Sequence, residues 1–137
     1  MKILVPTDGS SCAIRALKYA AKLASIDSNI AVVSLSVHDH QGSHPVCPRG
    51  VVSDYLHEVA EVEVKPHRLA SNLPAVSPVL SFSTGHVADE IVKIAETGGF
   101  DLIVMGLKGR SPIGELLLGS VAQKVLSATR LPVTLVK

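Results

Sequence analysis

The sequence predicts an α/β fold in which a doubly wound parallel sheet of five strands, in the order 3-2-1-4-5, carries helices on both faces. Two observations predict it. Five short runs of branched apolar residues alternate with segments that have helical spacing. The chain is also slightly apolar, with 47% hydrophobic and 18% charged residues, which fits a sheet covered on both faces. Its 137 residues match the size of one domain, so residues 1–137 are expected to form a single unit.

The first three elements follow from local patterns. Residues 3–5 form a continuous apolar run that Pro6 ends, as expected of a buried strand. Ser10 and Ser11 can cap the helix that follows. Its inward positions are expected at Ala13, Ala16, Leu17, Ala20, Ala21 and Ala24. The second strand is expected at residues 30–37, which are rich in β-branched residues.

The next segment has the weakest pattern. Residues 38–50 contain three His, two Pro, two Gly and Cys47, which favours a loop. His38, His40, His44 and Cys47 could bind a transition metal, but their irregular spacing favours a solvated loop, so no metal site formed by the protein alone is predicted. Residues 51–62 show a helical face, and Pro66 breaks or kinks it.

The second half of the chain alternates regularly. A third strand is expected at residues 79–83, and Gly85 leads into a helix with Asp89 and Glu90 in its first turn and Gly98-Gly99 as a left-handed cap. The inner face of that helix is expected at Val87, Ile91, Ile94 and Ala95. Residues 102–105 form the fourth strand, which Gly106 stops. The last helix begins near Gly119-Ser120, and residues 133–136 form the fifth strand after Pro132. The inward positions of the last helix are expected at Val121, Ala122, Val125 and Leu126.

Charge and hydropathy exclude several partners. The formal charge of +1 supplies no general field for nucleic acid or an anionic membrane. No apolar run approaches the roughly 18 residues that span a bilayer, and the opening residues are too short for a signal peptide. We therefore expect a cytoplasmic protein. Cys12 and Cys47 have no CxxC spacing and are expected to be reduced thiols.

The expected ligand site lies where the strand order reverses, beyond the carboxyl ends of strands one and four. Residues 6–9 and 105–109 stand there, and their glycines allow close approach of the backbone. Gly119-Ser120 begins a helix whose free amides and dipole favour an anion by roughly 0.3–1 kcal/mol per nearby charge. Asp8 can also be read as a turn residue or helix cap, and Lys108 and Arg110 as solvated charges.

The spacing Gly106-x2-Gly109-x9-Gly119-Ser120, together with the opening residues 3–10, resembles the ATP-binding branch of the universal stress protein family. The resemblance implies an adenine nucleotide alpha hydrolase-like fold that binds ATP, with Mg²⁺ carried by the nucleotide. It implies that Pro6, Thr7 and Asp8 lie beside the adenosine and that the backbone of Val37 meets the adenine edge. Ribose and phosphates would be contacted by the segment Met105, Gly106, Lys108 and Gly109 and by Gly119, Ser120 and Val121.

Two positions depart from the family pattern. Lys108 stands where the family often has His or Arg, which keeps a cation without the guanidinium geometry. Ala122 stands where another hydroxyl is common, so one phosphate hydrogen bond is expected to be missing.

Other readings of the fold and function are less consistent with the residues. A Walker P-loop and a dinucleotide GxGxxG motif are absent, and Ser83-Thr84 stands where a receiver domain would have its phosphoacceptor Asp. No general base or activated nucleophile follows the glycines, which favours a binding module over a fast enzyme. A slow ATPase or nucleotide transferase and a nucleotide-free adaptor remain as alternatives. The open edge at Val133, Thr134, Leu135 and Val136, together with the resemblance, predicts a homodimer through strand five.

Overall fold

The computed structural model describes residues 1–39, 76–83, 86–109 and 118–137. One sheet runs through them in the order β3-β2-β1-β4-β5, and every neighbouring pair of strands is parallel. The predicted α/β class with a parallel sheet is confirmed. The strands are β1 (Lys2–Pro6), β2 (Ala31–Asp39), β3 (Val76–Ser83), β4 (Leu102–Gly106) and β5 (Val133–Val136), and the helices are α1 (Ser11–Ile26), α3 (Val87–Thr97) and α4 (Ser120–Ala128).

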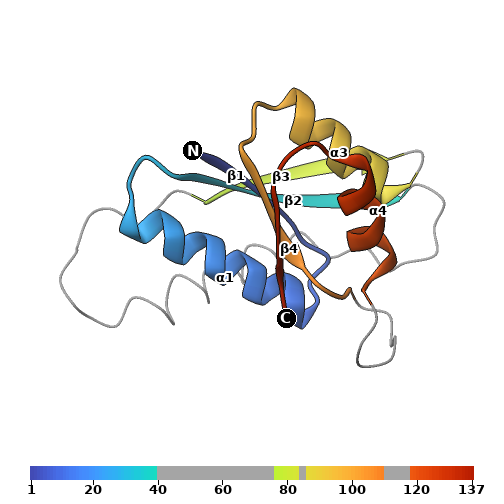
Figure 1. Cartoon of the computed structure of the whole chain (residues 1–137), viewed down its shortest axis with the longest axis horizontal. Helices are drawn as coiled ribbons and strands as arrows, with labels where there is room; N and C mark the ends of the chain where they lie inside the picture. The colour runs from blue at the N-terminus through green and yellow to red at the C-terminus, as the bar shows by residue number, and fades with distance from the viewer. Residues whose placement is uncertain (40–75, 84–85, 110–117) are drawn as a thin grey trace.

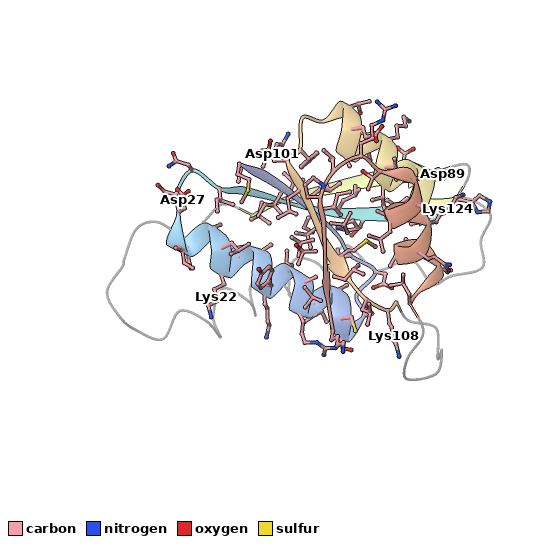
Figure 2. The ribbon with its side chains drawn as sticks, in the orientation of Figure 1. Lys22, Asp27, Asp89, Asp101, Lys108 and Lys124 are labelled. Atoms are coloured by element: carbon pink, nitrogen blue, oxygen red, sulfur yellow. The ribbon has the colours of Figure 1, made fainter. Side chains whose placement is uncertain are left out.

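Helices cover both faces of the sheet. Figure 1 shows α1 on one face and α3 with α4 on the other. The side chains of β1 alternate between two cores accordingly: Ile3 and Val5 pack with α1, and Leu4 packs with α3 and α4. An exposed ion pair between Asp89 and Lys124, 2.8 Å long, joins α3 to α4 (Figure 2).

Helix α1 begins as predicted and packs by small residues. The hydroxyl of Ser10 accepts a hydrogen bond from the amide of Ala13 at 3.2 Å, which makes Ser10 the N-cap. The predicted inward positions are buried except Ala21, which is only half-buried. The prediction that Ala21 is buried is therefore wrong. Ala21 lies at the edge of the buried face of α1, next to the solvent-exposed face.

Helix α3 ends at the predicted glycine pair. Asp89 and Glu90 occupy its first turn as expected. The C-cap residue Gly98 has a φ of −85°, whereas Gly99 has a φ of +67°. Gly99 makes the left-handed turn at the usual position, directly after the C-cap, so the predicted left-handed cap at Gly98-Gly99 is confirmed.

Helix α4 has a narrower buried face than predicted. Ala122 and Val125 are buried, but Val121 and Leu126 are 37% and 40% exposed. Successive residues of a helix are separated by about 100°, so Val121 and Leu126 fall on the two flanks of the line from Ala122 to Val125. This helix of nine residues buries only Ala122 and Val125 against the core on its face of the sheet. The prediction that Val121 and Leu126 point inward is therefore wrong.

Several strand boundaries shift by a few residues. Strand β3 begins at Val76, three residues before the expected start, and β4 includes Gly106. The predictions for the loop with His40, His44 and Cys47, the helix at 51–62, Gly85, and residues 110–117 concern parts of the chain that lie outside the described residues. Within the described ranges, no helix is both long and apolar enough to cross a membrane.

Candidate functional site

Strand β1 marks the place where the chain changes direction across the sheet. It pairs with β2 on one side and with β4 on the other, where Ile3 is opposite Leu102 and Leu4 is opposite Ile103. The helices before and after this point lie on opposite faces (Figure 1). The carboxyl ends of β1 and β4 therefore lie side by side at the position where open parallel sheets bind ligands.

The turn after β1 is held by local hydrogen bonds. The amide of Thr7 donates to the carbonyl of Leu35 at 2.8 Å, and Gly9 adopts a φ of +76° that favours glycine. Asp8 Oδ1 accepts from the amide of Ser10 at 2.9 Å. One carboxylate oxygen of Asp8, Oδ1, thus stabilises the turn, as expected if Asp8 is a turn residue. The hydrogen bond from Ser10 does not involve the other oxygen, Oδ2.

The segment after β4 is bound to both the last strand and the last helix. The amide of Leu107 donates to the carbonyl of Val136 at 2.8 Å, and the carbonyl of Leu107 accepts from the amide of Gly119 at 3.0 Å. A Cβ built on Gly119 would lie 3.3 Å from the Leu107 carbonyl oxygen and 3.4 Å from Lys108 Cα. Because these neighbours are backbone atoms, Gly119 lets the beginning of α4 lie directly on residues 107–109.

The turns after β1 and β4 also contact each other. A Cβ built on Gly109 would lie 2.8 Å from Asp8 Oδ2, and one built on Gly106 would lie 2.8 Å from the amide nitrogen of Ala13. The hydroxyl of Ser10 donates to the carbonyl of Lys108 at 3.4 Å. The three glycines of the predicted motif are therefore all positions of close contact with other parts of the chain.

The beginning of α4 differs from the beginnings of the other described helices. Helix α1 is capped by the Ser10 side chain, and α3 has two acidic residues in its first turn. Helix α4 has Gly119 as N-cap, with neither a side-chain cap nor an acidic first turn. Its first intrahelical bond joins the amide of Gln123 to the carbonyl of Gly119 at 2.9 Å. The amides of residues 120–122 therefore have no intrahelical acceptor, and within the described residues neither a side-chain cap nor a first-turn acid compensates the positive end of the helix dipole.

The structure brings most, but not all, of the predicted site residues together. Asp8, Gly106, Lys108, Gly109 and Gly119 contact one another or share hydrogen-bonded neighbours at the ends of β1 and β4. Lys108 is half-buried there, and Figure 2 shows it beyond the end of β4. Ser120 and Val121 follow on the exposed first turn of α4.

Pro6, Met105 and Val37 stand further from these contacts. Pro6 is buried at the end of β1, Met105 is 4% exposed in the core, and the Val37 side chain packs against the same core. The Val37 side chain is partly exposed, and its backbone is the part predicted to meet a ligand. Backbone groups alternate between the two sides of a strand, so Val37 faces the β1 side as Leu35 does. Among the described residues, the last hydrogen bond from the β1 end to β2 reaches Leu35.

Two residues of the site were missed by sequence reasoning. Ser10 was assigned only the cap of α1, although its hydroxyl also bonds the segment after β4. Leu107 could not be identified from its residue type, because its hydrogen bonds are made by its backbone amide and carbonyl. Within the described ranges, no cluster of three or more His, Cys, Asp or Glu side chains that could hold a metal ion is present.

A parallel sheet with helices on both faces, and with glycine backbone and a helix N-terminus at its crossing point, defines the class of doubly wound α/β proteins. The model of the Universal stress protein family matches residues 1–137. The chain belongs to the universal stress protein family. Universal stress protein MJ0531 of Methanocaldococcus jannaschii is 33% identical over 99% of this chain and 81% of its own length.

Solved structures show the same fold. The structure of the protein MJ0577 has a TM-score of 0.70 at 29% identity, covering 99% of this chain and 94% of its own. Universal stress protein UspA from Lactobacillus plantarum has a TM-score of 0.73 at 22% identity, covering 100% and 97%.

Two further structural neighbours contain adenine nucleotides. A universal stress protein in complex with cAMP has a TM-score of 0.70 at 21% identity and covers 100% of this chain and 97% of its own. A universal stress protein from Archaeoglobus fulgidus in complex with dAMP has a TM-score of 0.61 at 22% identity, covering 100% and 98%. At these identities the likeness shows the fold.

Proposed function

We propose that this protein is a regulatory ATP-binding module, a single cytoplasmic domain that takes up ATP with Mg²⁺ and acts as a homodimer. The observation that carries the proposal is the contact of Gly119 with residues 107–109, which places the uncapped beginning of α4 beside the two glycine turns. Nucleotide occupancy would then alter the segment between Gly106 and Gly119, and this change is the regulatory signal.

The phosphates are assigned to the beginning of α4. The amides of residues 120–122 and the hydroxyl of Ser120 stand at this helix end, and Lys108, whose Cα lies against Gly119, adds a cation to the same part of the site. A helix terminus contributes up to about 2 kcal/mol, and micromolar binding needs about 8 kcal/mol. The remainder is assigned to Lys108, adenine burial and Mg²⁺ on the nucleotide.

The adenosine is assigned to the β1 side of the crossing point. Asp8 Oδ2 is an acceptor directed at Gly109, where a ribose hydroxyl can donate to it. Val37 presents backbone groups beyond the last hydrogen bond between β1 and β2, which suits an adenine edge that carries both donor and acceptor groups. Pro6, Thr7 and Met105 support this end of the site by fixing the ends of β1 and β4.

The relatives support an adenine nucleotide rather than another anion. Two structures of the same fold hold cAMP and dAMP, so the fold accommodates adenosine with a phosphate group. The triphosphate is proposed because the resemblance to the ATP-binding branch of the family implies it, and because the beginning of α4 together with the cationic Lys108 favours a ligand of high negative charge.

Mass spectrometry of the ligand released from freshly purified protein tests the proposal directly, together with thermal unfolding in millimolar MgATP. We expect adenine nucleotide in the released fraction and a rise in melting temperature with MgATP. Gly119→Val should abolish that rise, because its side chain would meet the backbone of residues 107–109.

Gly99→Ala is the control. It strains a left-handed position that has no atom within 4 Å of the new Cβ and lies at the end of α3, so it should lower the melting temperature and leave the MgATP response intact. A wild-type protein without adenine nucleotide and without any response to MgATP would refute ATP binding.

The homodimer is proposed to form along β5, which pairs with β4 on one side and is the last strand of the sheet. The carbonyls of Pro132 and Val136 bond β4, so alternation directs the backbone groups of Val133 and Leu135 to the open edge. Leu135→Pro removes one outward donor and should give a monomer by sedimentation. Leu135→Ala loses the same packing, keeps the donor and should remain dimeric. A dimeric Leu135→Pro protein would contradict pairing through this edge.

A further inference from the structure

Ser10 has hydrogen bonds to both turns of the site. It is 8% exposed, and its amide donates to Asp8 Oδ1 at 2.9 Å. Its hydroxyl accepts from the amide of Ala13 at 3.2 Å and donates to the carbonyl of Lys108 at 3.4 Å. Through its amide and its side chain, this one buried residue therefore links the turn after β1, the first turn of α1 and the segment after β4.

The bond to Lys108 determines where the next amide points. The carbonyl of Lys108 and the N–H of Gly109 belong to one planar trans peptide, so they point in opposite directions. Since the carbonyl faces Ser10, the N–H of Gly109 faces away from the beginning of α1. The nitrogen of Gly109 lies 3.5 Å from the Cβ position of Gly119, so this peptide is adjacent to the beginning of α4.

We propose that Ser10 is a positioning residue for the nucleotide, which it serves without touching it: its hydroxyl fixes the Lys108–Gly109 peptide so that the Gly109 amide joins the amides of α4 as a phosphate donor. This inference rests on the proposed function and adds a residue that neither the glycine spacing nor the helix terminus identifies. Donor groups held before the ligand arrives need no reordering on binding, and this favours affinity.

Capping alone does not require a serine at this position. An N-cap needs only an acceptor or a permissive backbone, so Asn, Asp and Gly serve nearly as well as Ser. Donation to a carbonyl requires the hydroxyl hydrogen, which neither Asp nor Gly can supply. Ser10→Gly consequently keeps most of the cap and removes the bond to Lys108.

The test compares Ser10→Gly with wild type in two measurements: the backbone ¹⁵N order parameter of Gly109 in the nucleotide-free protein, and MgATP affinity by titration calorimetry. We expect a lower order parameter at Gly109 and an affinity about two- to tenfold lower, the range that one neutral hydrogen bond accounts for. The matched control is Ser25→Gly, which makes the same change near the other end of α1, where the Ser25 hydroxyl bonds only the carbonyl of Lys22 at 2.7 Å. It should loosen the helix and leave both measurements at the site unchanged.

The outcomes separate this inference from the proposed function. If wild type binds MgATP and Ser10→Gly binds it equally well, the positioning role is overturned while ATP binding stands. If the order parameter of Gly109 in Ser10→Gly equals that of wild type, the Ser10–Lys108 bond does not hold the peptide, and the inference fails whatever the protein binds. If wild type binds no nucleotide, ATP binding itself fails. A lower order parameter at Gly109 would then reduce Ser10 to a structural role and overturn its nucleotide role.

Discussion

The carboxylate of Asp8 occupies the space that a side chain at position 109 would need, since a Cβ built on Gly109 lies 2.8 Å from Asp8 Oδ2. The corresponding neighbours of Gly106 and Gly119 are mainly backbone atoms or the Cβ of Cys12. The three glycines of the motif therefore differ in kind. Gly109 makes room for a movable acidic group, whereas Gly106 and Gly119 permit contact between fixed parts of the chain.

Gly109→Ala should weaken nucleotide binding with little loss of stability. The new methyl group forces the Asp8 carboxylate to turn, which disturbs its bond from the Ser10 amide and displaces the acceptor assigned to the ribose. We expect the MgATP binding free energy to weaken by about 1 kcal/mol, the usual value of one hydrogen bond. Calorimetry on the variant measures it, and Gly99→Ala again serves as the control. Unchanged affinity would remove Asp8 from the nucleotide site.

Gly106→Ala should instead destabilise the whole protein. Its Cβ would lie 2.8 Å from both the amide nitrogen of Ala13 and the carbonyl carbon of Cys12, which belong to the first turn of α1. Helix α1 would have to move away from β4, and overpacking of this type costs about 1–3 kcal/mol. Chemical denaturation of Gly106→Ala and Gly109→Ala side by side checks the difference. Equal midpoints for the two variants would contradict the distinction drawn between these glycines.

The fold was accessible from the sequence because its elements are specified locally. Ser10 as a cap, the apolar run of β1 and Pro132 before β5 each indicate one boundary without reference to the rest of the chain. The errors concern helix faces. Val121 and Leu126 have suitable spacing for burial, but the width of a buried face depends on where the helix sits over the sheet, which no local pattern encodes.

The site was accessible only in part. The glycine spacing indicates positions 106, 109 and 119 because a Cβ at each would lie close to another part of the chain, mainly backbone at 106 and 119 and the Asp8 carboxylate at 109. The roles of Ser10 and Leu107 depend on contacts between distant parts of the chain. The Ser10 hydroxyl bonds the carbonyl of Lys108, 98 residues away, and the Leu107 carbonyl bonds the amide of Gly119, 12 residues away. A serine in a cap position looks the same whether or not its hydroxyl has a distant acceptor, so tertiary structure was needed to find the second bond.

The far end of the β1–β4 pair is held by a second set of contacts. The backbone of Lys2 exchanges hydrogen bonds with Asp101 at 2.7 and 2.9 Å, through the Asp101 carboxylate and amide. The Lys2 ammonium donates to the carbonyl of Gly98 at 2.8 Å and lies 4.3 Å from the centre of the Phe100 ring. This cation therefore binds the C-terminal end of α3 and an aromatic face together.

Lys2→Met should lower stability by about 1 kcal/mol, because it keeps the apolar stem and removes the charge that serves the helix end and the ring. The expected fall in melting temperature is about 3–5 °C for a chain of this size. Lys22→Met is the control, since Lys22 is exposed on α1 and points away from the sheet (Figure 2). The two variants should differ in thermal unfolding, and equal melting temperatures would show that the Lys2 contacts add nothing.

One buried hydroxyl is unsatisfied, and its removal should stabilise the protein. Ser34 on β2 is 1% exposed, and its Oγ has no hydrogen-bond partner among the described residues. A buried polar group without a partner costs roughly 1–3 kcal/mol. Removing the hydroxyl recovers this free energy, but the small void that the hydroxyl leaves cancels a part of the gain. Ser34→Ala should therefore gain about 1 kcal/mol, and Ser34→Cys, which puts a larger and less polar thiol there, separates the effect of polarity from that of volume.

Equilibrium denaturation of both Ser34 variants measures the gain, and the response to MgATP should be the same as in wild type. Ser34 on β2 is opposite Val5 on β1, and Val5 precedes the turn that carries Asp8. Ser34 therefore lies outside the proposed nucleotide site. A less stable Ser34→Ala protein would mean that the hydroxyl is bonded in solution, for instance to an enclosed water. A lost response to MgATP would mean instead that a change at Ser34 alters the proposed nucleotide site at the ends of β1 and β4.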